Sequence, residues 1–227
     1  ASDDETAVSV LEGMQHYTGN HLVYEKGADV AVGAVSFIQE VQINTTDKSG
    51  FDAAIKAAQN SDVVVMVLGE HGFQTGEARS RTELGLPGVQ QELLEEVYKV
   101  NPNIVLVLTN GRPLAIPWAA LHIPAIVETW HLGTQSGNAI AQVLYGDYNP
   151  SGKLPMTFPR HVGQLPIYYN HFNTGRPAPN ETAFNYVSAY TDLKNSPKFP
   201  FGFGLSYTTF DYTDLKLSKN KIKLKKT

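Results

Sequence analysis

The sequence predicts an α/β fold, a three-layer αβα sandwich built on a mainly parallel sheet. Three apolar segments lack the alternation of a half-exposed strand and are typical of strands covered on both faces: residues 62–68, 103–110 and 124–130. Helical patterns alternate with these segments, at residues 51–60, 86–101 and 137–146. Because strands that alternate with helices join through right-handed crossovers, we expect helices on both faces of the sheet.

The individual elements differ in how clearly the sequence marks them. Residues 21–28, HLVYEKGA, are a weaker strand candidate that precedes the others. The helix predicted over 86–101 is the best marked, because Pro87 stands near its first turn and Asn101 and Pro102 close it. Its apolar residues recur at helical spacing, at Val89, Leu93, Leu94 and Val97.

The amino-acid composition of the chain changes after Pro150. Residues 147–204 are rich in Pro, Gly, Tyr, Phe and Asn, and the loop over 169–190 is long for a compact domain. The stretch SYTTFDYTDLKLS alternates and indicates a strand that enters another element. We therefore expect an α/β domain over residues 1–205 and a linker or first strand of a further domain over 206–227.

Composition excludes several classes of function. The chain has 227 residues, of which 42% are hydrophobic and 18% charged, and its net charge of −4 gives no field that attracts nucleic acid. It has no cysteine, so disulfides, zinc-thiolate sites and cysteine nucleophiles are excluded. The longest apolar runs are far shorter than the roughly 20 residues of a membrane-spanning helix. The first residues, ASDDETAVSV, lack a signal-peptide pattern and a starting Met, which fits a processed chain or a fragment.

Polar side chains follow each of the three predicted strands. Glu70 comes after the first, Arg112 after the second, and Trp130 and His131 after the third. In open α/β sheets ligands bind outside the carboxyl ends of the strands, so these residues are expected to share one rim.

Two carboxylates near this rim are candidates for a general acid or base, Glu70 and Glu77. The alternative is that both are surface carboxylates paired with Arg79 and Arg81. Two roles are open for Arg112 as well: its guanidinium can clamp a ligand, or it can donate hydrogen bonds to loop carbonyls.

Other rim residues carry weaker signals. Trp130 can stack on a sugar face, but a tryptophan at a strand end is often part of the core. The histidines His71, His131, His161 and His171 show no metal-binding spacing, so no catalytic metal is expected. The chain also lacks a phosphate-binding loop and a nucleophile elbow.

A succession of longer segments resembles one known family. The segments are LGEHGFQTGEARSR, LPGVQQELLEEV, IVLVLTNGRPL, AIVETWHLGTQSGNAIAQVLYGDYNPSGKLPMTFPR and PFGFGLSYTTF. Over roughly residues 20–212, the chain resembles the C-terminal α/β sandwich domain of family 3 glycoside hydrolases, and most strongly the periplasmic β-glucosidases of bacteria.

The resemblance implies a larger enzyme. Family members carry the nucleophilic aspartate on a (β/α)8-type barrel, which this chain lacks, and the active site lies between the barrel and the sandwich. Many members continue into a fibronectin-III-like domain, which residues 206–227 would begin. The implied activity is that of a retaining, exo-acting β-glucosidase on terminal non-reducing β-D-glucosyl residues. No cofactor, nucleic acid or membrane insertion is expected, and the implied location is periplasmic or secreted.

The resemblance also implies where the second catalytic carboxylate lies. Retaining glycosidases hold two carboxyl groups about 5 Å apart, and in many members the acid/base comes from the loop that corresponds to residues 69–81. Glu70 is the first candidate, Glu77 the second, and a barrel residue the third. Substrate binding is expected from His71, Arg79, Arg81 and Trp130, and the loop over 169–190 is expected to line the leaving-group side. The alternative function is a non-catalytic sugar-binding or interaction module.

Overall fold

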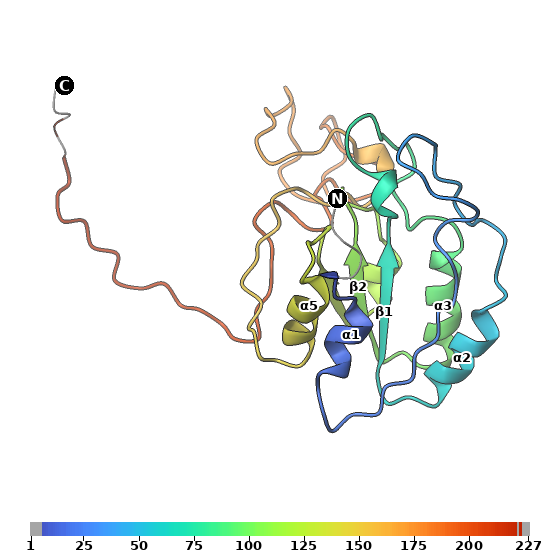
Figure 1. The fold of residues 1–227 in the computed structure, drawn as a ribbon. Helices are drawn as coiled ribbons and strands as arrows, with labels where there is room; N and C mark the ends of the chain where they lie inside the picture. The colour runs from blue at the N-terminus through green and yellow to red at the C-terminus, as the bar shows by residue number, and fades with distance from the viewer. Residues whose placement is uncertain (1–5, 222, 224–227) are drawn as a thin grey trace.

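The computed structural model describes residues 6–221 and residue 223, and its elements alternate between helix and strand (Figure 1). The helices and strands are α1 (Val10–Gln15), α2 (Phe51–Gln59), β1 (Val64–Gly69), α3 (Gln90–Val100), β2 (Ile104–Thr109), α4 (Ala119–His122), β3 (Ala125–Glu128) and α5 (Ser136–Leu144). Two short 3-10 helices are η2 (Gly72–Gln74) and η3 (Val162–Gln164).

The three clearly predicted strands form one parallel sheet in the order β1-β2-β3. Val64 pairs with Ile104 at one end of the β1–β2 ladder and Gly69 pairs with Thr109 at the other. Between β2 and β3, Leu108 pairs with Glu128 at the same end. The prediction of a parallel sheet is therefore confirmed, and the register brings the carboxyl ends of all three strands to one edge.

Helices cover both sides of the sheet, which confirms the three-layer prediction. Helices α2 and α3 pack together on one side, and α1 packs against α5 on the other (Figure 1). The fully buried centre of the core consists mainly of aliphatic side chains of β2 and α3, among them Leu94, Ile104, Leu106 and Leu108. Strand β1 is less covered than predicted, because Val67 is 44% exposed on this outer strand.

Helix α3 starts later than the sequence suggests, and its first residue fixes the end of β1. The helix begins at Gln90, three residues after Pro87. The buried Gln90 amide accepts a hydrogen bond from the backbone N–H of Gly69 at 2.7 Å and donates one to the Gly69 carbonyl at 2.8 Å. A Cβ atom on Gly69 would lie 1.9 Å from the Thr109 carbonyl oxygen, so only glycine fits between the two strands here. The point at which the chain leaves β1 toward Glu70 is thus rigidly held.

One predicted strand of the sandwich does not form. Residues 21–28 pair with no other strand in the described chain, and Val23 and Tyr24 are exposed. An apolar run of this kind forms a strand only where a neighbouring strand pairs with it, and none does. The stretch from Ser206, expected as a linker or the first strand of a further domain, forms no strand within the described residues, and Tyr212 and Leu215 are exposed. Figure 1 shows it extending away from the sandwich.

Two short helices, α1 and α4, were not predicted from the sequence. Helix α1 is set by a capping box, in which the Ser9 hydroxyl accepts from the backbone of Glu12 and the Glu12 side chain accepts from the backbone of Ser9. Of the expected segments 1–205 and 206–227, residues 1–5, 222 and 224–227 lie outside the described residues. Among those that are described, no helix is long and apolar enough to cross a membrane.

Candidate active-site rim

The carboxyl ends of the three strands place their following residues side by side. The Glu70 backbone N–H donates to the Thr109 carbonyl at 2.7 Å, which continues the β1–β2 ladder by one residue. The Thr129 backbone N–H donates to the Leu108 carbonyl at 2.9 Å and does the same between β3 and β2. The rim that the sequence predicts after each strand is therefore present.

Glu70 lies beneath this rim, and its side chain is fully buried. Its Oε1 atom lies 2.6 Å from a guanidinium nitrogen of Arg81 and 3.0 Å from Nε of Arg112. Its Oε2 atom accepts from the backbone N–H of Gly111 at 3.1 Å. Both oxygens are engaged by donors of the protein, and charge-assisted bonds of this kind are strong when buried.

The two arginines that pair with Glu70 also hold the following loop in place. Arg81 donates to the Gly85 carbonyl at 3.3 Å, and Arg112 donates to the Gln74 carbonyl at 2.6 Å. Of the two roles considered for Arg112, the bond to a loop carbonyl is present, and its second partner, Glu70, is a carboxylate of the protein itself. The Glu70 ion pairs anchor the loop of residues 70–85 to the ends of β1 and β2.

Glu77 lies on the same loop but in a different environment. It is exposed, and it lines a hollow of about 510 Å³ together with Phe37, Phe73, Arg79 and neighbouring loop residues. Arg79 donates to the Phe37 carbonyl at 3.0 Å, and within the described residues it forms no ion pair with Glu70 or Glu77. Of the two arginine–carboxylate pairings considered from the sequence, the one formed is Arg81 with Glu70.

Phe37 and Phe73 are rim residues that the sequence analysis missed. Their ring centroids lie 6.1 Å apart with an edge-to-face geometry, and Phe37 is 76% exposed. Phe73 sits between two glutamates in GEHGFQTGE, so its place in the loop was a usable signal. Phe37 had none, because it comes from a segment without helix or strand, more than thirty residues before the loop.

Two histidines of the rim sit close to the buried ion pairs. His71 caps η2, because its Nδ1 atom accepts from the Phe73 backbone N–H at 3.1 Å. Burial lowers the pKa of His131 below its ordinary value, with the charge of Glu70 opposing this and those of His71 and Arg112 adding to it. His71 and His131 are therefore brought together near Glu70 and Arg112.

Trp130 combines a core contact with an unusual backbone. Its ring lies 5.7 Å from that of the buried Phe158, measured between centroids, and the residue as a whole is half-buried. Its φ is 54°, in the left-handed region that bulky residues rarely occupy. The core contact considered for Trp130 is therefore present. Its stacking on a sugar stays a prediction.

A third carboxyl group, Glu128, belongs to the rim and was not singled out from the sequence. Its Oε1 atom accepts from the Trp130 backbone N–H at 3.0 Å, and its Oε2 atom accepts from the Asn110 side-chain amide at 3.3 Å. Burial raises the pKa of Glu128 to about 7, against the two hydrogen bonds, which lower it. A carboxylate as the last residue of a buried strand was the signal available in the sequence.

The raised pKa of Glu128 predicts how stability changes with pH. Its ordinary value is 4.5, so between pH 4.5 and about 7 the unfolded chain is ionised while the folded chain keeps the proton. Folding stability from this group is therefore full at low pH and falls as pH rises. The free energy of unfolding of the Glu128→Gln variant, relative to that of the wild type, should therefore increase by about 2–3 kcal/mol between pH 5 and pH 8. Urea unfolding at the two pH values measures this, and a difference that does not change with pH would contradict it.

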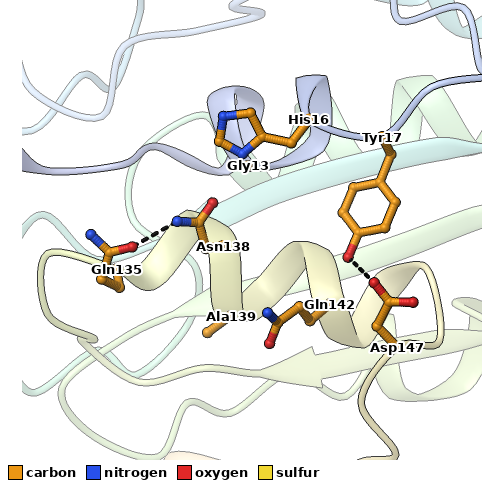
Figure 2. A pocket seen from close by; sticks show the side chains of 8 residues that line it. All are labelled: Gly13, His16, Tyr17, Gln135, Asn138, Ala139, Gln142 and Asp147. Atoms are coloured by element: carbon orange, nitrogen blue, oxygen red, sulfur yellow. Dashed lines mark hydrogen bonds between the residues drawn. The ribbon is translucent and has the colours of Figure 1, made fainter.

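A second hollow lies away from the rim, between α1 and α5 (Figure 2). Its volume is about 570 Å³, and its lining residues include His16, Tyr17, Gln142 and Asp147. The Tyr17 hydroxyl donates to Asp147 at 2.5 Å across one end. None of the rim residues described above lines it. Within residues 6–221 and 223, no group of three or more His, Cys, Asp or Glu side chains is arranged to hold a metal ion.

Comparisons with known proteins agree with one another. The profile of the glycosyl hydrolase family 3 C-terminal domain matches residues 2–207. The chain is 47% identical to a periplasmic β-glucosidase of Salmonella typhimurium over 221 residues, which are 93% of this chain and 29% of that protein. It is 42% identical to a β-xylosidase of Formosa agariphila, over 95% of this chain and 27% of that protein.

A solved structure shows the same fold. The crystal structure of the Listeria innocua β-glucosidase in complex with isofagomine superposes with a TM-score of 0.76 at 37% identity, and the match covers 92% of this chain and 27% of that one. The chain thus spans under a third of the length of the relatives it matches. The family expected from the sequence is confirmed, and the chain belongs to glycosyl hydrolase family 3 as its C-terminal domain.

Proposed function

We propose that this chain is the second domain of a retaining, exo-acting β-glucosidase that releases terminal non-reducing β-D-glucosyl residues. In this proposal a (β/α)8-type barrel carries the nucleophile, and the rim of the sandwich closes the active site over it. Family membership supports the proposal, as do relatives named β-glucosidase among the bacterial matches. The name of the Salmonella relative supports a periplasmic or secreted location, and residues 206–227 would lead to a further domain.

Within this proposal, Glu77 supplies the acid/base carboxyl group. The observation that carries this assignment is the contrast between the two glutamates of the loop. A proton donor must reach the glycosidic oxygen and must be free to gain and lose its proton. Glu70 has both oxygens bound to buried donors, whereas Glu77 is exposed and lines a hollow. Glu70 then acts as a positioning residue that anchors the loop through Arg81 and Arg112.

The walls of the hollow give the leaving group a place. When Glu77 protonates the glycosidic oxygen, the departing group lies on the Glu77 side of the bond. Phe37 and Phe73 line that hollow, and aromatic rings pack well on aryl groups and on the apolar faces of sugars. Arg79 fixes the position of the Phe37 segment rather than binding a carboxylate. In this proposal His71 and Trp130 contact the sugar from the strand ends, while Arg81 stays paired with Glu70.

The reaction that we propose is tested on the complete protein. Proton NMR during hydrolysis of an aryl β-D-glucoside should show β-glucose as the first product, because two displacements restore the original configuration. The matching xyloside, run in parallel, measures the preference between the two sugars named among the relatives. If α-glucose appears first, the retaining mechanism is wrong. If the protein binds glucosides but hydrolyses none, the chain serves a sugar-binding module instead.

A further inference from the structure

Glu128 has the attributes of a residue with a specific task. It is the last residue of β3, and each of its carboxyl oxygens receives one hydrogen bond, from the Trp130 backbone and from the Asn110 side chain. Burial raises its pKa to about 7. Since an apolar residue at such a place avoids the cost of burying an ionised group, the carboxyl does not serve stability best.

The turn that Glu128 caps is strained. Trp130 has a φ of 54°, and a bulky residue keeps this left-handed conformation only where its surroundings hold it there. The bond from the Trp130 N–H to the Glu128 carboxyl spans two residues and closes this turn. A second hydrogen bond stabilises the turn, because the Thr129 hydroxyl donates to the Leu108 carbonyl at 2.7 Å. The chain therefore leaves β3 in one direction, which presents Trp130 and then His131.

Glu128 also connects this turn to the buried ion pairs. The Asn110 amide donates to Glu128 and, at 2.9 Å, to the carbonyl of Arg112, which in turn pairs with Glu70. Asn110 is fully buried, and its Oδ1 atom has no hydrogen-bond partner within the described residues. One continuous set of contacts thus runs from the anchor of the Glu77 loop to the Trp130 backbone.

We propose that Glu128 is a positioning residue for substrate binding, which holds the Trp130–His131 turn in the conformation that presents Trp130 to the sugar. This inference rests on the proposed function, because it takes the rim as part of a β-glucosidase active site. It adds to that function a group that touches no reacting atom and acts through Trp130. The expected consequence of its loss is weaker binding of substrate with unchanged chemistry.

Steady-state kinetics of the complete protein on an aryl β-D-glucoside tests this inference. Glu128→Ala should raise KM about tenfold and leave kcat within about twofold, since the lost contact acts equally on bound substrate and transition state. Glu128→Gln keeps an acceptor for the Trp130 N–H and should restore KM to within about threefold of the wild type. Trp130→Ala should raise KM by itself, and adding Glu128→Ala to it should change KM less than twofold further. Glu96→Ala, at a residue of α3 whose side chain pairs with the exposed Lys99, is the control that leaves KM unchanged.

The outcomes separate a positioning role from a structural one. If Glu128→Ala lowers the melting temperature but leaves KM unchanged, Glu128 contributes to stability and not to substrate binding, and the inference is overturned. Additive effects of Glu128→Ala and Trp130→Ala overturn it as well. If the alanine variant does not fold, Glu128→Asp withdraws the carboxyl by one methylene, and the same rise in KM is expected. If the wild type hydrolyses no β-glycoside, the proposed function and this inference are both overturned. If the wild type is active and the Glu128 variants keep its KM, the inference alone is overturned.

Discussion

Replacing Glu77 by Gln in the complete protein should lower kcat/KM for glucosides with poor leaving groups by about 10²–10⁴-fold. The amide keeps the size of the side chain but cannot deliver a proton to the departing oxygen. Aryl glucosides whose leaving groups depart without protonation should lose far less in the first chemical step. The measurement is kcat/KM against the pKa of the leaving phenol for the wild type and the variant. The variant's line should be markedly steeper.

A matched control separates this effect from a general disturbance of the loop. Glu83 is another exposed carboxylate, six residues after Glu77 on the same loop. Glu83→Gln should retain the kcat/KM of the wild type on both kinds of substrate. The assignment of Glu77 would be wrong if Glu77→Gln lost activity equally on good and poor leaving groups, or lost none.

Replacing Glu70 by Gln should have its largest effect on stability. The change leaves the guanidiniums of Arg81 and Arg112 largely buried without their counter-charge, since their side chains are only 18% and 19% exposed. Breaking a buried ion pair by removing one partner costs about 3–5 kcal/mol in the free energy of unfolding. Urea unfolding measures this loss. Activity should fall on all substrates alike, because the loop that bears Glu77 loses its anchor.

An exposed ion pair of the same chain provides the comparison. Lys48 and Glu92 lie 2.5 Å apart, with side chains 43% and 49% exposed. Glu92→Gln should cost less than about 1 kcal/mol, because solvent screens such pairs. Two results would contradict the structural role of Glu70: stability close to that of the wild type, or a loss of activity that depends on the leaving group as expected for Glu77.

Much of the fold follows from local patterns in the sequence. The runs that became β1, β2 and β3 are mainly apolar and lack alternation, and no helix pattern competes with them, so their type and parallel pairing could be predicted. The segment 21–28 looked similar but is not a strand, because strand formation depends on a partner that local sequence does not reveal. Helix α1 was missed because its six residues give too short a pattern, although Ser9 and Glu12 form its capping box.

The rim could be predicted more completely than the roles of its residues. Glu70 and Glu77 both follow a glycine and both precede the same arginines, so spacing alone does not distinguish them. Their difference lies in three-dimensional contacts, since Glu70 reaches Gly111 and Arg112 across 41 and 42 residues of chain. The same holds for Phe37, which contacts the loop through Arg79 and Phe73 although it lies more than thirty residues earlier in the chain. Long-range pairing of polar groups was the information that the sequence lacked.

A crystal structure of the complete protein with an unhydrolysed β-glucoside bound tests the assignment of Glu77 directly. We predict that the Glu77 carboxyl lies about 2.6–3.2 Å from the glycosidic oxygen, the reach of a proton donor. Glu70 should remain paired with Arg81 and Arg112, away from the substrate. A structure in which Glu70 or a carboxyl of another domain occupies the place beside that oxygen, with Glu77 turned to solvent, would contradict the account.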